Sequence, residues 1–427
     1  MLKQRPLSGA FIFISLLLVS GSFQSAAQGQ GNFPPLEFKD GERIVFLGGS
    51  LFENELKEGY IEFAFATRWP GRELTFRNLG WTGDNVFGEA RSTFTSTPTA
   101  YQQLFQQIRS TWPDYVLVAY GTVEAQKGAA GLDAFSKGLE VIIDSIDALG
   151  AQTILLSTIP VKLAGTPENT VTQNKYLKLY SDAIMSIASK RKKRFIDIFT
   201  PVLQNNGAIY AYNGIHLNDQ GYYYLAQVLE RALSWPARGE TITIDAAAIS
   251  GGAKSGGANS VGGKVEFSIE EKLLPLPVPA SAQVTQGASE DEASGTSAQG
   301  ASEKADPAVS VTIQIKGLEA DRYTLTENGE QLLTASAADL AKGITLDKGI
   351  SQAQSARLSD SIGRKNNLFF QQYRPLNRTY ILGFREYEQG RHKQGLRDLG
   401  LIITRLEEEI HRHCKPVKKN YALSPVK

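Results

Sequence analysis

The stretch "IVFLGGSLFEN", residues 44–54, begins with four apolar residues and then breaks at two glycines and Ser50. A short apolar run bounded by such a break is typical of a buried strand that ends in a loop. Gly-Gly-Ser after an apolar run is also ordinary turn chemistry. This stretch alone therefore leaves two interpretations of Ser50 open, a nucleophile or part of a turn.

The chain around this stretch alternates short apolar runs with amphipathic segments. We expect strands at residues 44–47, 74–78, 115–120, 153–157 and 194–198, and helices at 134–149, 174–190 and 220–233. Most of the strands are almost continuously apolar, as strands buried on both faces require. The alternation predicts an α/β domain with a parallel sheet and helices on both faces.

Three positions follow the ends of predicted strands, namely Ser50, Gly83 and Val123. In open parallel sheets, ligands bind beyond the carboxyl ends of the strands. The clustering of these positions at one edge favours a site over a simple turn. His216 is the only histidine between residues 43 and 233, so it is the candidate base if Ser50 works through a histidine of its own domain.

The N-terminal 27 residues are typical of an export signal. Lys3 and Arg5 precede an apolar run at residues 11–19 that is too short to span a bilayer, and Ser-Ala-Ala at 25–27 resembles a cleavage site. No later run is long enough for a membrane helix. We therefore expect an exported protein, periplasmic or extracellular, without a transmembrane anchor.

The chain of 427 residues is long enough for more than one domain. We expect a signal peptide at 1–27, an α/β domain at 40–238, a small β-rich domain at 239–335 and a helical region at 336–427. The Ser/Ala/Gly/Glu tract at 280–307 lacks core-forming residues and is expected to be a disordered insert. "ENGE" at 327–330 predicts a hairpin turn, because Asn-Gly tolerates positive φ at both central positions.

Charge and cysteine content exclude several kinds of function. Lys and Arg number 45 against 44 Asp and Glu, so no global field favours nucleic acid, and the basic run at 190–194 reads as a helix end. Cys414 is the single cysteine, so no intrachain disulfide forms. The two histidines of "HRHC" at 411–414 would point to different faces of a helix, which favours a solvated helix end over a metal site.

Four sequence blocks resemble, in order and spacing, those of the SGNH or GDSL hydrolases: "FLGGSLFE" (46–53), "NLGWTGDNV" (78–86), "YGTVEA" (120–125) and "NGIHLNDQGY" (213–222). The resemblance implies a flavodoxin-like α/β/α sandwich. It also implies that Ser50 is the nucleophile, that His216 is the base, and that the N–H groups of Ser50 and Gly83 face the oxyanion. No metal or organic cofactor is implied.

The sequence departs from the family pattern at three positions. The aspartate of the first block is Gly49, the asparagine of the third block is Val123, and the aspartate three residues before the histidine is Asn213. Val123 donates no hydrogen bond to an oxyanion, so this donor is lost. Asn213 orients an imidazole but does not stabilise its positive charge. A carboxylate in a neighbouring block is a candidate replacement, with Asp84, Glu124 and Asp219 available.

Residues 365–390 resemble an extension found on some exported bacterial SGNH proteins. Its aromatic residues are candidates for a carbohydrate-stacking surface or, as base rates favour, for packing against the first domain; they are Phe369, Phe370, Tyr373 and Tyr380.

The leading hypothesis is an exported serine ester hydrolase that acts on acyl or acetyl esters, including those of polysaccharides. The alternative is a degenerate SGNH domain that binds a glycan or a partner protein without turnover, which Gly49, Val123 and Asn213 together favour. Lipid hydrolysis is a third hypothesis, for which the sequence provides no membrane-facing helix. The oligomeric state is left open.

Overall fold

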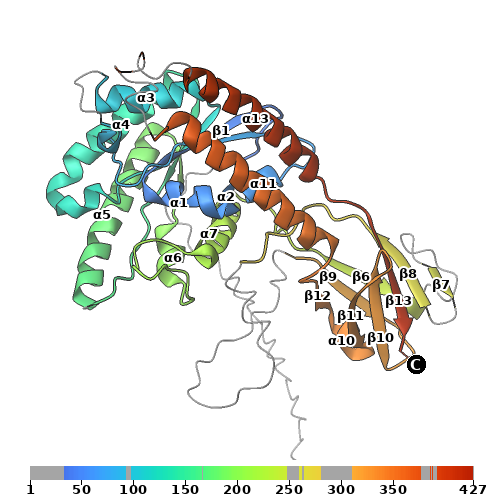
Figure 1. Cartoon of the computed structure of the whole chain (residues 1–427). Helices are drawn as coiled ribbons and strands as arrows, with labels where there is room; N and C mark the ends of the chain where they lie inside the picture. Colours follow the sequence, from blue (N-terminus) through green and yellow to red (C-terminus); the bar gives the residue numbers. More distant parts are fainter. Residues whose placement is uncertain are drawn as a thin grey trace, which may run out of the picture.

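The computed structural model describes residues 33–92, 98–165, 167–247, 259–261, 264–279, 310–376, 385, 387 and 392–426. The expected signal peptide at 1–27 and the expected disordered insert at 280–307 lie outside these residues. Figure 1 shows an α/β domain, a second region made mostly of strands, and two long helices that connect them. Within the described residues, no helix is long and apolar enough to cross a membrane.

The α/β domain is built on a five-stranded sheet in the order β2-β1-β3-β4-β5, and every neighbouring pair is parallel. All five strands that the sequence predicts are present: β1 (Arg43–Gly48), β2 (Thr75–Asn78), β3 (Tyr115–Ala119), β4 (Gln152–Leu156) and β5 (Arg194–Ile196). They are almost wholly buried because helices cover both faces. The order is that of the flavodoxin-like fold.

Helices from both halves of the domain form the two outer layers. One face of the sheet packs against α1 (Ser50–Glu58), α2 (Tyr60–Ala66) and α7 (Asp219–Ala232). The other face packs against α3 (Ala100–Ser110), α4 (Leu132–Asp147) and α5 (Pro167–Arg191). Two short helices, η1 (Glu89–Arg91) and η2 (Glu124–Gly131), and α6 (Phe199–Gln204) lie in the connections. The predicted α/β/α sandwich is confirmed.

The second region contains two sheets around a core of its own. The larger has the order β11-β10-β13-β8-β7, from Glu330–Ser336, Arg322–Glu327, Lys419–Pro425, Lys264–Ile269 and Asn259–Val261. The smaller has the order β12-β9-β6, from Ile344–Thr345, Thr312–Lys316 and Thr241–Asp245, with α10 (Ala337–Lys342) beside it. The predicted hairpin turn joins β10 and β11, with positive φ at Asn328 and Gly329.

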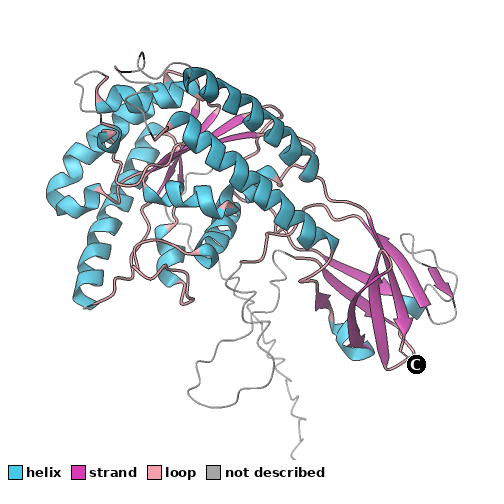
Figure 2. Ribbon diagram, in the orientation of Figure 1, coloured by secondary structure: helices cyan, strands magenta, loops and turns pink. Residues whose placement is uncertain are grey.

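The last strand, β13, was not anticipated from the sequence. It lies between β10 and β8 and pairs antiparallel with both, so the end of the chain returns to the middle of the larger sheet. Lys419 at its start is fully buried and forms an ion pair with Glu271. Figure 2 shows that strands make up most of the second region. The C-terminal part of the chain is therefore helical only up to residue 413.

Two long helices, α11 (Ile350–Tyr373) and α13 (His392–His413), pack side by side and against the α/β domain along the edge strand β2. The contact contains a buried ion pair between Lys365 Nζ and Glu62 of α2, 2.7 Å apart. Desolvation lowers the pKa of Lys365, and the adjacent Glu62 opposes that shift. Phe369 is buried against the domain, in line with the packing interpretation, whereas Tyr380 lies outside the described residues.

The interpretation of "HRHC" as a solvated helix end was wrong. Cys414 is 2% exposed and belongs to the core beneath α11, and His411 Nε2 lies 2.8 Å from the carbonyl oxygen of Leu74. Leu406, Ile410 and Cys414 follow one another at intervals of four residues, so the apolar face of α13 extends through the cysteine. Among the described residues, no group of three metal-ligating side chains is found.

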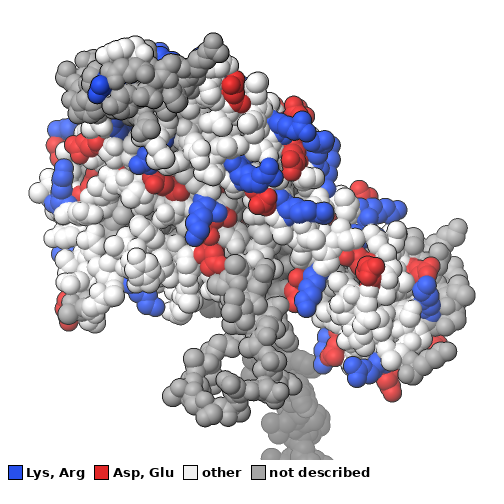
Figure 3. Space-filling model, viewed as in Figure 1, with Lys and Arg blue, Asp and Glu red and all other residues white. Residues whose placement is uncertain are grey.

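Charged residues of both signs are interspersed on the face shown in Figure 3. The basic run at the end of α5 pairs with carboxylates of α4: Lys190 Nζ lies 3.1 Å from Glu140, and Lys193 Nζ lies 2.5 Å from Asp147. These exposed pairs contribute little stability individually. They agree with the interpretation of this run as a helix end.

The environment of Cys414 predicts an inert thiol. Burial raises the pKa of Cys414 to about 12, so almost no reactive thiolate is present at pH 8. We expect alkylation by iodoacetamide to be at least ~100-fold slower in the native protein than in 6 M guanidinium chloride, as followed by mass spectrometry. Equal rates in the two conditions would contradict the buried position of this residue.

Candidate active site

Ser50 is placed by the junction between β1 and α1. Gly49 precedes the helix without a side-chain cap, and the first intrahelical bond runs from Glu53 N–H to Gly49 O at 3.2 Å. The N–H of Ser50 therefore has no partner within the helix and lies at its positive end. Connections after β1 and β3 go to opposite faces of the sheet, so Ser50 lies at the crevice where the strand order reverses.

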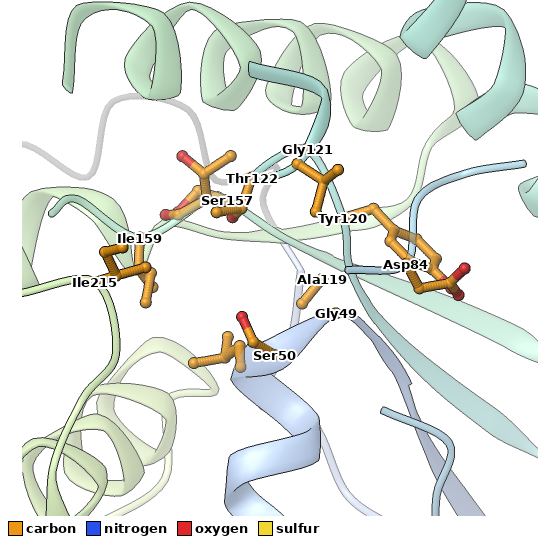
Figure 4. A pocket seen from close by; sticks show the side chains of 13 residues that line it. Gly49, Ser50, Asp84, Ala119, Tyr120, Gly121, Thr122, Ser157, Ile159 and Ile215 are labelled. Carbon is orange, nitrogen blue, oxygen red and sulfur yellow. The ribbon is translucent and has the colours of Figure 1, made fainter. Parts of the chain in front are cut away.

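A small pocket of about 30 Å³ opens at this crevice. Its wall includes Ser50, Val123 and Ile215, together with Ala119, Ser157 and Ile159. Figure 4 shows the Ser50 hydroxyl directed into the pocket, with Ile215 and Ile159 beside it. The structure thus brings the first-block serine, the third-block valine and the residue before His216 to one cavity.

Gly83 lies on the loop that follows β2, in a position that only glycine adopts easily, with φ of 79°. Asp84 N–H donates to Trp81 O at 3.0 Å and closes the turn around it. A side chain on Gly49 would meet the carbonyl oxygen of Asp84 at 3.7 Å, so the loop passes close to the start of α1. Gly83 itself is not part of the pocket wall, whereas its neighbour Asp84 is.

Asn213 fixes both the loop of His216 and the hydrogen-bond role of its ring. The side-chain oxygen of Asn213 accepts from Ile215 N–H at 3.0 Å and from His216 N–H at 3.1 Å. Because these backbone donors determine where the oxygen lies, the amide nitrogen faces His216 Nδ1, 3.2 Å away. An amide nitrogen only donates, so Nδ1 must accept and the proton of the neutral ring is on Nε2.

This tautomer is the opposite of the one that a general base requires. A histidine that takes the proton of a serine carries its own proton on Nδ1 and presents a bare Nε2. No hydrogen bond joins Ser50 Oγ to His216 within the described part of the chain. Ile215 lines the pocket of Ser50 but His216 does not, and the imidazole is held in the less reactive form.

Two of the three candidate replacement carboxylates have structural partners instead. Asp84 is fully buried, and one oxygen accepts from both Arg91 Nε and the Tyr120 hydroxyl at 2.8 Å. In Figure 4, Tyr120 and Asp84 are turned toward each other on the side of the pocket away from Ile215. Glu124 accepts from the N–H groups of Val86 and Gly121, at 2.9 and 3.0 Å.

Burial raises the pKa of Glu124, although its backbone hydrogen bonds act in the opposite direction. Asp219 begins α7, where its carboxylate accepts from Gln220 N–H at 2.8 Å. Its charge also raises the pKa values of Tyr60 and Glu58, in both cases after the larger effect of burial. Asp219 thus lies near the end of α1 and remains the candidate charge in the fourth block.

Ser157 and Thr122 also line the pocket, and neither is among the sequence-predicted site residues. The Ser157 hydroxyl accepts from the N–H groups of Ile198 and Phe199, each at 2.9 Å, so it holds the chain after β5. Thr122 precedes Val123 and is half-buried in the wall. Ser157 ends the strand expected at 153–157 and Thr122 follows the one expected at 115–120, so their position at strand ends was the available signal.

The α/β domain is similar to a known family of hydrolases. The family model described as the GDSL-like lipase/acylhydrolase family matches residues 46–224. The fold and the ordered blocks therefore define the α/β domain as a GDSL-like, or SGNH, hydrolase domain. No curated protein matches the sequence significantly.

Several solved structures are similar to this chain at low sequence identity. A gut microbial diltiazem-metabolizing enzyme, BT4096, is 17% identical, with a TM-score of 0.67 over 91% of this chain and 99% of that chain. A mutant of the acetylxylan esterase Axe2 from Geobacillus stearothermophilus is 15% identical over 47% of this chain and 97% of that one, with a TM-score of 0.38. The acetyl xylan esterase AlAXEase is 19% identical over 44% and 98%, with a TM-score of 0.36.

Proposed function

We propose that this protein is an exported serine ester hydrolase with attenuated turnover, acting on small acyl or acetyl esters carried by carbohydrates. The observation that carries the proposal is the position of Ser50, at the positive end of α1 and directed into a pocket whose wall includes the residue before His216. Membership of the domain in the hydrolase family supports the same reaction class.

In the proposed reaction, Ser50 Oγ attacks the ester carbonyl carbon while His216 accepts the hydroxyl proton. The carbonyl oxygen becomes an oxyanion, which the N–H groups of Ser50 and Gly83 stabilise. Collapse of the intermediate breaks the carbon–oxygen ester bond, and His216 gives the proton to the departing alcohol. Water then hydrolyses the acyl-Ser50 intermediate by the same steps, releasing the carboxylic acid and restoring the serine.

The size and lining of the pocket favour a short acyl group. The pocket is small, with a volume of about 30 Å³, and Ala119, Val123, Ile159 and Ile215 give it apolar walls. An acetyl group has one methyl group to bury there.

A carbohydrate leaving group is supported by the loop that holds His216. Tyr212, one residue before Asn213, is 98% exposed. An exposed aromatic ring on the loop of His216 offers a flat apolar surface for a sugar ring. The export signal expected at 1–27 would bring the protein to cell-surface or environmental polysaccharides.

Binding without turnover is the second candidate function, and the orientation of Asn213 favours it. The amide holds His216 in the tautomer that does not accept a proton from Ser50, and Val123 supplies no oxyanion donor. A domain with both features would keep the pocket and bind an acylated glycan.

Reaction with a fluorophosphonate probe distinguishes the two functions. We expect the purified protein to form a covalent adduct on Ser50, located by mass spectrometry of its peptides, because the probe reacts with serines that an active site makes nucleophilic. Ser157 is an internal control, since it lines the same pocket but holds backbone N–H groups. Absence of an adduct on Ser50 would favour the binding function.

A further inference from the structure

The last turn of α11 contacts the loop that carries Gly83, residues 80–84, which we call the oxyanion loop. The Tyr373 hydroxyl donates to Gly80 O at 3.0 Å. Burial raises the pKa of Tyr373, so the phenol stays protonated and remains a donor. These contacts join residues almost 300 positions apart in the sequence, so the C-terminal region reaches the site of the α/β domain.

Arg374 covers the side chain of Trp81 in the same loop. Its guanidinium carbon lies 3.8 Å from the centre of the Trp81 ring, and Trp81 is only 8% exposed. The main chain of Trp81 forms two hydrogen bonds. Its N–H donates to Gly48 O at 2.9 Å, and its carbonyl accepts from Asp84 N–H at 3.0 Å. The position of Trp81 therefore sets that of the turn around Gly83 relative to β1.

Glu53 connects Arg374, the oxyanion loop and the nucleophile helix. One of its carboxylate oxygens accepts from Arg374 Nη1 at 3.0 Å and from Thr82 N–H at 2.5 Å. Glu53 lies three residues after Ser50 in α1. A single carboxylate thus fixes the distance between the helix that presents the serine and the loop that presents Gly83.

The oxyanion loop also packs tightly against the backbone of α1. A side chain on Gly80 would lie 2.2 Å from Glu53 N, so the loop already touches the backbone of α1. The Arg374–Glu53 pair is partly exposed, and such pairs contribute little to stability. We expect the pair to affect the position of the oxyanion loop relative to Ser50, because an oxyanion donor acts only when it is held in place before charge develops.

We propose that Tyr373 and Arg374 are positioning residues that hold the oxyanion loop in register with Ser50, so that the C-terminal region takes part in the reaction of the α/β domain. The catalytic consequence rests on the proposed hydrolase function. The positioning itself is a property of the loop and has its own measurement.

The test compares the full-length wild type with the double variant Tyr373→Phe/Arg374→Ala and with Arg364→Ala. Arg364 is a matched control, because it lies on the same helix and forms an exposed pair with Asp360. Amide hydrogen exchange is measured for the peptides that contain Thr82 and Val86. Thr82 N–H depends on Glu53, whereas Val86 N–H depends on Glu124 and is the internal reference.

In the double variant we expect exchange at Thr82 to rise at least tenfold while Val86 stays unchanged, and kcat for an acetyl ester to fall by about tenfold with KM within twofold. Arg374→Lys keeps the positive charge next to Glu53 but loses the flat stacking on Trp81. Its exchange rate at Thr82 and its kcat should therefore lie between those of the wild type and the double variant. Arg364→Ala should match the wild type.

Two results would overturn the inference: unchanged exchange at Thr82, or faster exchange with unchanged kcat in an active enzyme. A wild type that hydrolyses no ester would refute the hydrolase function instead, and the exchange at Thr82 would still decide whether α11 positions the loop.

Discussion

Replacement of Ser50 by alanine is expected to abolish ester hydrolysis. The variant loses the nucleophile, so kcat/KM for p-nitrophenyl acetate should fall at least ~10³-fold, to the level of an inactive control protein. The free energy of unfolding should change by less than about 1 kcal/mol, because the hydroxyl is directed into the pocket and its loss removes little packing. The melting temperature, measured by calorimetry, should therefore be nearly unchanged.

Ser110→Ala is the control for this experiment. Ser110 is an exposed serine of α3 whose hydroxyl binds only the carbonyl of Gln107 in its own helix. It should leave both activity and melting temperature unchanged. Hydrolysis by Ser50→Ala at the wild-type rate would show that another group performs the reaction.

The five strands of the α/β domain and its helices α4, α5 and α7 could be predicted because each of them has a local signal. β1 and β3 are short apolar runs, β1 ends at Gly48 and Gly121 follows β3 after one residue, and α4 and α7 repeat apolar residues with a helical period. The turn at Asn328 and Gly329 was equally local, since two residues with positive φ suit a two-residue hairpin.

The return of the chain to the second region could not be predicted in this way. β13 reads "KNYALSP" and begins with Lys419 and Asn420, two residue types that are mostly exposed, yet Lys419 is buried because Glu271 pairs with it. Pairing between β13 and β8 joins residues about 150 positions apart. No short window of sequence contains that partner.

The candidate site shows the same division between local and distant information. The first, third and fourth blocks placed Ser50, Val123 and Ile215, the residue before His216, around one cavity, because parallel strands bring their carboxyl ends together. The direction in which the Asn213 amide points depended on two backbone N–H groups of its own loop. The contact of Arg374 with Trp81 depended on the docking of α11, which only the folded chain reveals.

Asn213→Asp combined with Val123→Asn is expected to raise turnover more than any other change proposed for this site. An aspartate at 213 fits without rearrangement, since one oxygen can keep the hydrogen bonds to Ile215 N–H and His216 N–H. Its second oxygen takes the place of the amide nitrogen, 3.2 Å from His216 Nδ1. That oxygen accepts a hydrogen bond from Nδ1–H, so Nε2 of the neutral ring is left bare and able to act as the base.

The size of the gain follows from the chemistry of each change. In serine proteases, the loss of this aspartate to asparagine lowers turnover by about 10⁴, largely through the wrong tautomer. We expect Asn213→Asp alone to raise kcat/KM for a small acetyl ester by about 100-fold, less than the full factor because the pocket has adapted around a valine. Val123→Asn alone adds an oxyanion donor and should give about tenfold.

Two control variants test whether added negative charge alone, or a larger pocket alone, would raise turnover. Asn205→Asp makes the same charge change in a turn of the same kind, where the side-chain oxygen accepts from Gly207 N–H, and should not alter turnover. Val123→Ala enlarges the pocket without adding a donor, so its kcat/KM should be lower than that of Val123→Asn. Steady-state kinetics with p-nitrophenyl acetate gives kcat and KM for each variant.

The double variant also decides between the two proposed functions. A gain in kcat with little change in KM means that Ser50, His216 and Gly83 already hold a geometry complementary to the transition state, and that only the tautomer and one donor limit the wild type. If the folded double variant hydrolyses no ester, correcting both groups has not produced catalysis. The pocket beside Ser50 is then a binding site, because the remaining requirement, a nucleophile within reach of its base, is the one that these two substitutions leave unchanged.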